Sequence, residues 1–102
     1  MKPTRVTVSR KAERSLRKVP KMVAAKFFMW VKQIEEHGLS AVQSLPGYND
    51  EALGGKLKGI RSIRLSLGYR AYYRLSNQTL KCIFVEEVNH HDYKKIERLF
   101  GL

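Results

Sequence analysis

The apolar residues of this chain change their spacing part-way along its 102 residues, and this change constrains the fold more than any other feature. Over residues 9–37 they recur every three or four positions, the period of one face of a helix. Over residues 60–85 they alternate with other residues, the period of one face of a strand. Helices followed by a run of strands are typical of an α+β protein, and the length suits a single domain spanning residues 1–102.

Two helices are expected in the first part of the chain. Ser9 can cap the first helix, while Pro20 ends it and fits the first turn of the second. Gly38 is a suitable stop for the second helix. The two apolar stripes are Ala12, Leu16 and Val19, and Val23, Phe27, Trp30, Val31 and Ile34. One stripe on each helix predicts a helical hairpin that lies on a sheet.

Four strands are expected to form that sheet. The first is short, Arg5–Val8, and residues 39–55 that follow the helices read mostly as loop, with one helical turn at 40–44. The other three strands carry the alternating residues Ile63, Leu65 and Leu67, then Tyr69, Ala71 and Tyr73, then Leu80, Cys82 and Phe84. Tight turns between these strands predict an antiparallel meander, whose last strand, apolar on both faces, is internal. The expected architecture is a helical hairpin packed on a small, mostly antiparallel four-stranded sheet.

The charge of the chain favours a polyanionic partner. Lys and Arg number 20 against 9 Asp and Glu, so the formal net charge is +11. Residues 55–81 hold seven basic residues and no acidic one. This balance leaves RNA, DNA, an anionic membrane surface and an acidic protein as possible partners.

The termini and the single cysteine indicate a cytoplasmic protein. Cys82 is the only cysteine, which excludes an internal disulfide and a metal site built on paired thiolates. The charged N-terminus lacks the apolar core of a signal peptide. The longest apolar stretch, residues 22–31, contains Lys26 and is too short to span a bilayer.

Two arginines are expected to face each other in the first hairpin of the meander. We expect a three-residue loop at 66–68 with its glycine in the left-handed conformation. Leu65 then pairs with Tyr69, and Arg64 lies directly opposite Arg70. Like charges in that position destabilise a sheet, by about a few tenths of a kcal/mol or more.

A phosphate between the two guanidiniums would explain the pair, because each can bind an oxyanion through a fork of N–H groups. Arg61, near the start of the same strand, is a candidate for a third contact. The further candidate RNA-binding residues of this basic stretch are Lys56, Lys58 and Arg74. The alternative reading is a set of solvated arginines on the open face of a sheet, and spacing alone leaves both readings open.

A polar cluster follows the last strand. It comprises Asn89, His90, His91, Asp92 and Tyr93. Imidazoles move protons near neutral pH, so such a cluster could supply the proton transfers of RNA cleavage while arginines stabilise the phosphorane. The alternative is a set of turn-forming residues. Metal binding is disfavoured, because adjacent histidines in an extended chain point to opposite sides.

Several short motifs occur in an order and spacing that resemble the RelE/HigB-type toxins of the RelE/ParE superfamily, which belong to type II toxin–antitoxin systems. The motifs are Pro46-Gly47-Tyr48-Asn49-Asp50-Glu51, Leu57-Lys58-Gly59, Arg61-Ser62-Ile63-Arg64-Leu65, Tyr69-Arg70-Ala71-Tyr72-Tyr73 and Glu87-Val88-Asn89-His90-His91-Asp92-Tyr93. The N-terminal helical hairpin matches as well, so the resemblance covers nearly the whole chain.

The resemblance implies a metal-independent endoribonuclease that cleaves mRNA, usually in the ribosomal A site, and thereby inhibits translation. It implies a cognate antitoxin that wraps and neutralises the toxin, with mRNA and the ribosome as the other partners. Operator DNA would be contacted only through the toxin–antitoxin complex. No cofactor, no metal and no membrane association are expected.

The resemblance also implies roles for single residues. Arg70 corresponds to the phosphate-binding arginine of the family's Tyr-Arg motif, and Arg64 to the basic residue of the preceding strand. Tyr93 corresponds to the C-terminal tyrosine of the RelE pattern, and Asp92 joins it in an Asp-Tyr pair as in HigB-like members.

Two departures from RelE leave the general base open. This chain has His90-His91 where RelE has basic residues other than histidine, and Arg64 in place of a lysine. Histidine changes its protonation state more readily than arginine does. We therefore favour His91 as the proton carrier, with His90 as the alternate.

Two other functions are compatible with parts of the sequence. ParE-like proteins share the fold but poison DNA gyrase by binding, without a nuclease site. A plain nucleic-acid-binding domain would explain the net charge. The Arg64/Arg70 pair and the C-terminal cluster favour the nuclease over the gyrase poison, which needs neither. A plain nucleic-acid-binding domain would leave the clustered proton donors unexplained.

Overall fold

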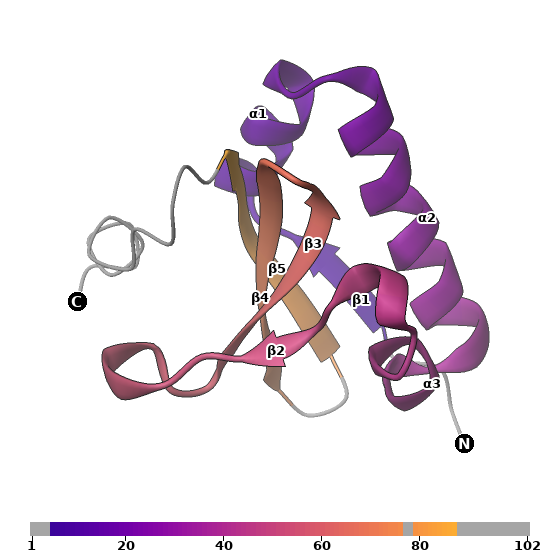
Figure 1. The fold of residues 1–102 in the computed structure, drawn as a ribbon, viewed down its shortest axis with the longest axis vertical. Helices are drawn as coiled ribbons and strands as arrows, with labels where there is room; N and C mark the ends of the chain where they lie inside the picture. Colours follow the sequence, from indigo (N-terminus) through magenta and orange to yellow (C-terminus); the bar gives the residue numbers. More distant parts are fainter. Residues whose placement is uncertain (1–4, 77–78, 88–102) are drawn as a thin grey trace.

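The computed structural model describes residues 5–76 and 79–87, and the order of its elements is the one expected of an α+β chain (Figure 1). The helices are α1 (Arg10–Lys18), α2 (Lys21–His37) and α3 (Leu39–Gln43). The strands are β1 (Arg5–Val8), β2 (Glu51–Ala52), β3 (Ile60–Ser66), β4 (Tyr69–Ser76) and β5 (Thr79–Glu87). Short 3-10 turns lie at Pro46–Tyr48 and Gly55–Leu57.

The helix boundaries follow from local chemistry as predicted. The Ser9 hydroxyl accepts the backbone N–H of Ala12 at 3.0 Å and so caps α1. Pro20 stands immediately before α2. Gly38 ends α2 with a φ of 87°, a conformation that residues with a Cβ rarely adopt.

The sheet has one strand more than the four expected. Its order is β1-β5-β4-β3-β2, and β1 runs parallel to β5 while the other pairs are antiparallel. The internal position of the last strand is thereby confirmed, because β5 lies between β1 and β4. The additional strand, β2, consists of Glu51 and Ala52, which pair with Ser62 and Arg61. Two residues are too few to show a strand period, which is why this stretch reads as loop in the sequence.

The β3–β4 hairpin confirms one predicted pair and corrects another. Arg64 is in register with Arg70, as expected. Tyr69, however, pairs with Ser66 and not with Leu65, because the register shifts between Arg64 and Ser66. Leu65 is thus the extra residue of a bulge in β3, and the turn holds two residues instead of three. Gly68 is not among the glycines with positive φ, so its expected left-handed conformation is also wrong.

The helical hairpin covers one face of the sheet and encloses the main hydrophobic core (Figure 1). The largest fully buried side chains of this core are Trp30, Tyr73, Phe27, Ile34, Ile63 and Leu80. The opposite face of β3 and β4 has buried residues of its own, Ile60, Ser62 and Tyr72. None of the helices within the described residues is long and apolar enough to cross a membrane.

Candidate active site

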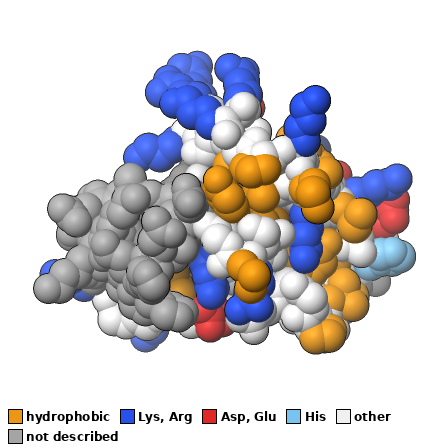
Figure 2. All heavy atoms as spheres, turned by 45° about the horizontal axis from the view of Figure 1, so that its top comes forward, with side chains coloured by type: hydrophobic (Ala, Val, Ile, Leu, Met, Phe, Trp, Pro, Cys, Tyr) orange, Lys and Arg blue, Asp and Glu red, His pale blue; other side chains and the backbone are white. Residues whose placement is uncertain are grey.

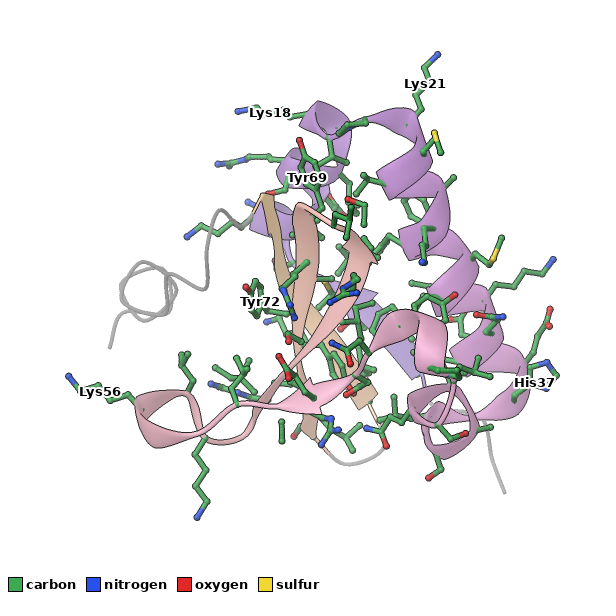
Figure 3. The ribbon with its side chains drawn as sticks, viewed as in Figure 1. Lys18, Lys21, His37, Lys56, Tyr69 and Tyr72 are labelled. Atoms are coloured by element: carbon green, nitrogen blue, oxygen red, sulfur yellow. The ribbon has the colours of Figure 1, made fainter. Side chains whose placement is uncertain are left out.

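Arg64 and Arg70 lie on the face of the sheet that points away from the helices. In β3, Arg64 alternates with Ile63 and Leu65, which both belong to the helix-covered core. Arg70 is its register partner in β4 and therefore shares that face. Tyr72, two residues along β4, lies on the side of the sheet away from α2 in Figure 3. The structure thus places the two predicted phosphate-binding arginines directly beside each other.

Glu51 is a neighbour of this pair that sequence reasoning missed. Its Oε1 lies 3.3 Å from Nη1 of Arg70, and the Arg70 side chain is only 16% exposed while that of Glu51 is 45% exposed. Strand β2 holds Glu51 there by pairing it with Ser62 of β3. A signal did exist in the sequence, because Asp50 and Glu51 are the only acidic residues between positions 37 and 85.

The second of these acids, Asp50, is the centre of a buried network. Its side chain is 1% exposed. Nε of Arg61 donates to Asp50 Oδ1 at 2.6 Å, and the Tyr73 hydroxyl donates to Asp50 Oδ2 at 2.6 Å. The Tyr73 oxygen in turn accepts from Nε2 of Gln43 at 3.0 Å. Both oxygens of the buried carboxylate therefore accept a hydrogen bond, which offsets the cost of its burial.

The network perturbs the titration of two of its members. Burial raises the pKa of Tyr73, and the hydrogen bond to Asp50 raises it further. Burial lowers the pKa of Arg61, but the hydrogen bond and the charge of Asp50 together outweigh burial and raise it above its usual value. Arg61 thus stays a cation, and Tyr73 stays a neutral hydrogen-bond donor.

Arg61 does not join the arginine pair, contrary to the sequence expectation. It is in register with Tyr73, whose side chain lies in the helix-covered core, so the two side chains share that face. The alternation along β3 therefore directs Arg61 to the opposite side of the sheet from Arg64. Successive side chains of a strand point to opposite faces, so two residues three positions apart lie on opposite faces of the sheet.

The other candidate RNA-binding residues lie around the same sheet face. Arg74 is exposed and follows Arg70 at an even spacing in β4. Lys56 and Lys58 are exposed at the turn between β2 and β3, and Figure 3 shows Lys56 reaching away from the sheet. Arg74 therefore shares the face of the arginine pair, whereas Lys56 is not directed at the pair.

The predicted proton-transfer cluster of His90, His91, Asp92 and Tyr93 lies outside the described residues. Within the described part of the chain, no group of three His, Cys, Asp or Glu side chains could hold a metal ion. Cys82 is buried, and burial raises the pKa of its thiol to about 12, so it is protonated at neutral pH.

Comparison with known proteins identifies the fold. The chain matches a chain of the RelBE2 toxin–antitoxin complex from Mycobacterium tuberculosis with a TM-score of 0.59 and 26% identity, covering 84% of this chain and 99% of the other. It matches the archaeal RelE–RelB complex from Pyrococcus horikoshii with a TM-score of 0.68 and 17% identity, covering 86% and 98%. The chain has the fold of the RelE-family toxins. The resemblance that its sequence motifs carry is thereby confirmed.

A third solved structure shares the RelE-type fold of the chain. YafQ from E. coli matches with a TM-score of 0.66 and 15% identity, covering 82% of this chain and 92% of YafQ. No protein-family model and no curated protein matches the sequence. The neighbours therefore establish the RelE-type architecture, and the chemistry rests on the side chains described above.

Proposed function

We propose that this chain is the toxin of a bacterial toxin–antitoxin pair and that it acts as an endoribonuclease on mRNA, inhibiting translation at the ribosomal A site. The likeness to toxins of such systems supports the first part. The observation that carries the second is the register pair of Arg64 and Arg70, with the Glu51 carboxylate 3.3 Å from Arg70. Two cations and a carboxylate on one sheet face can serve phosphodiester chemistry without a metal.

The two guanidiniums would bind the scissile phosphate. Arg70 is largely buried and paired, so its guanidinium is held in place before substrate binds. Arg64 has no ion pair with any described residue, which leaves its charge available to the phosphate. Both would stabilise the charge that develops on the phosphorane when the 2′-oxygen attacks phosphorus.

Proton transfer needs a base and an acid. The 2′-OH must lose its proton as the O2′–P bond forms, and the leaving 5′-oxygen must gain one as the P–O5′ bond breaks. Glu51 could accept the first proton, because its carboxylate lies beside the arginine that would hold the phosphate and is accessible from solvent. His91 remains the predicted proton carrier of the C-terminal cluster, with His90 as the alternate and Asp92 and Tyr93 as further acid–base groups.

Induction of the chain in cells, followed by mapping of mRNA 5′ ends, tests the proposal. The unsubstituted chain should produce cuts in register with codons. Arg64→Ala and Arg70→Ala should each reduce cleavage by roughly 100-fold or more, since preorganised charge is lost from the transition state. Glu51→Gln should reduce it by about 100-fold without weakening RNA binding.

Arg14→Ala is the matched control, because Arg14 is an exposed arginine of α1 and its loss changes the net charge equally. It should leave cleavage within about twofold of the unsubstituted chain, as is usual for surface substitutions. Equal losses of cleavage in Arg14→Ala and Arg70→Ala would show that the arginine pair acts only through the net charge of the chain. Intact transcripts together with cleaved chromosomal DNA would contradict the nuclease proposal and favour a ParE-like gyrase poison.

A further inference from the structure

Strand β2 provides few restraints of its own on Glu51. It consists of two residues and lies at the edge of the sheet, so it pairs with β3 alone. Just beyond it, the backbone N–H of Leu53 donates to the Ile60 carbonyl at 2.9 Å. Short segments at the edge of a sheet open more readily than internal strands, because fewer contacts hold them. The position of Glu51 beside Arg70 therefore needs a further restraint on the chain.

Asp50, immediately before β2, supplies such a restraint from the opposite face of the sheet. Its two carboxylate oxygens accept from Nε of Arg61 and from the Tyr73 hydroxyl, both at 2.6 Å. Arg61 and Tyr73 are register partners in β3 and β4, so the carboxylate is tied to two strands at once. Gln43 of α3 donates to the same hydroxyl at 3.0 Å. We call these four residues the Asp50 network.

The backbone turn at Asn49 leads the chain into this network. Asn49 has a φ of 46°, and it is the only residue other than glycine with a positive φ in the part of the chain that the structure describes. Its N–H donates to the Pro46 carbonyl at 3.1 Å and closes the 3-10 turn. Asparagine tolerates this conformation better than most residues, but the surrounding contacts must still fix it. The turn and the network together direct Asp50 to the core and Glu51 to the face of the arginine pair.

The basic surroundings of Glu51 offer it other cations. On the face drawn in Figure 2, Lys and Arg side chains project at several places and few acidic side chains are visible. Arg64 and Arg74 share the sheet face of Arg70, and a half-exposed carboxylate on a freely moving backbone would be attracted to them as well. Among the described residues, however, Glu51 forms an ion pair with Arg70 alone. A restrained backbone favours this single partner over the alternatives.

We propose that Asp50 and Tyr73 are positioning residues, which hold Glu51 in place for proton transfer through the backbone of β2. Both lie on the core side of the sheet, opposite to Arg64 and Arg70, so neither can contact a phosphate bound there. A misplacement of about 1 Å in a reacting group can cost on the order of 100-fold in rate. Loss of the network therefore slows the chemical step and leaves RNA binding intact. The inference rests on the proposed function, in which Glu51 accepts the proton.

Single-turnover cleavage of ribosome-bound mRNA, with the chain in excess, tests the proposal. Tyr73→Phe removes one hydrogen bond and keeps the ring in the core, while Asp50→Asn keeps the volume and removes one acceptor oxygen. Each should lower the cleavage rate at saturation by roughly tenfold or more. The concentration of chain that gives half-saturation should stay within about twofold. Tyr48→Phe is the matched control, because the Tyr48 hydroxyl donates to Gln33 of α2, and its rate should also stay within about twofold.

The Glu51→Gln background separates positioning from loss of folded protein. If the network acts only through Glu51, adding Tyr73→Phe to this background should lower the rate by no more than about twofold. A substitution that merely unfolds part of the sample lowers the rate equally in both backgrounds. Equal losses in the two backgrounds, an equal loss in Tyr48→Phe, or unchanged rates in Tyr73→Phe and Asp50→Asn would overturn the proposal.

An NMR measurement on the arginine side chain gives a readout that does not depend on cleavage. The Nε–H resonance of Arg70 should move in Tyr73→Phe in the same direction as in Glu51→Gln, and it should stay in place in Tyr48→Phe. An unmoved resonance in Tyr73→Phe would contradict the inference, because Glu51 would keep its place without the network. If the unsubstituted chain cleaves no mRNA, the proposed function fails, and the resonance still shows whether the network holds Glu51 at Arg70.

Discussion

At the scale of single residues, the adjacent acids Asp50 and Glu51 differ in burial and in their partners. Asp50 is buried and binds Arg61 and Tyr73 through short hydrogen bonds. Glu51 is half-exposed and faces Arg70 from the other side of the chain. Adjacent side chains in an extended segment point in opposite directions, so one dipeptide serves the core-side network and the candidate active site. The hydrogen bonds of Asp50 therefore contribute to the stability of the core, while the Glu51–Arg70 pair belongs to the candidate active site.

Replacing the two acids should separate these contributions. Asp50→Ala should lower the free energy of unfolding by about 2–4 kcal/mol, because the buried Tyr73 hydroxyl loses its acceptor and Arg61 loses its counter-charge. Glu51→Gln should change it by less than about 1 kcal/mol, as expected of an ion pair with a half-exposed partner. Urea unfolding of both variants measures the difference. A loss in Asp50→Ala no greater than that in Glu51→Gln would show that the network does not stabilise the fold.

Because its thiol is buried, Cys82 should make the free energy of unfolding decrease at alkaline pH. Burial raises the pKa of its thiol from 9.0 to about 12. The pKa of the thiol is higher in the folded chain than in the unfolded chain. Its contribution to the free energy of unfolding is therefore fully present below about pH 9 and is lost as pH rises toward 12. Between these limits the unfolded chain releases a proton that the folded chain retains. Cys82→Ala should therefore flatten the alkaline decline in unfolding free energy by up to about 1.4 kcal/mol per pH unit.

Urea titrations at several values between pH 8 and pH 11 measure that slope in both proteins. The buried Tyr73 phenol remains in both and contributes in the same direction, so the difference between the slopes isolates the thiol. Parallel slopes would show that the thiol ionises as readily in the folded chain as in the unfolded one.

At the scale of elements, α2 has two apolar faces with different roles. The inner face carries Phe27 and Trp30, whose ring centroids lie 5.8 Å apart in the core, and Trp30 contacts Tyr73 of β4 at 5.4 Å. This face joins the helix to the sheet. The outer face includes Phe28, which is 55% exposed and meets the buried Phe27 edge-on.

Two neighbouring phenylalanines allow a direct test of this division. Phe27→Ala should destabilise the domain by about 3–5 kcal/mol, the range for a large aromatic side chain removed from a core. Phe28→Ala should destabilise it by about 1 kcal/mol, since its ring is half-exposed and loses mainly the edge-on contact with Phe27. Urea denaturation of both variants provides the comparison. Equal losses would mean that Phe28 is part of the core.

At the scale of the whole molecule, basic residues of the described part of the chain occupy two different surfaces. One is the sheet face with Arg64, Arg70 and Arg74, which points away from the helices. The other is the helical hairpin, whose first helix exposes a row of basic residues. The sheet lies between these two surfaces, so the contribution of each to RNA binding can be tested separately (Figure 1).

Salt dependence should distinguish the two surfaces. If about three to five cations contact RNA phosphates, the logarithm of RNA affinity should fall with the logarithm of salt concentration with a slope of about −2 to −3.5. Arg64→Ala should reduce the magnitude of that slope by about 0.7–1, while Arg14→Ala should leave it unchanged. Fluorescence anisotropy with a single-stranded RNA at several salt concentrations measures both slopes. A smaller slope in Arg14→Ala would place the RNA on the helical hairpin.

Local sequence patterns predicted the helical hairpin and four of the five strands of this protein. The helical hairpin, the three-strand meander and the opposition of Arg64 and Arg70 depend on periodicity, capping residues and hairpin length, which act between residues close in the chain. The same patterns misjudged the turn at 66–68, because a bulge and a longer loop fit the same residues and only pairing with β4 selects between them.

Tertiary structure decided the surroundings of those elements. The pairing of β2 with β3 brings Glu51 to Arg70, and burial beneath the helices joins Asp50 to Tyr73 across 23 positions of sequence. The parallel pairing of β1 with β5 and the exposure of Phe28 likewise depend on how the helices settle on the sheet. Such contacts link segments distant in the chain, and their free energy depends on distances and burial that no local period encodes.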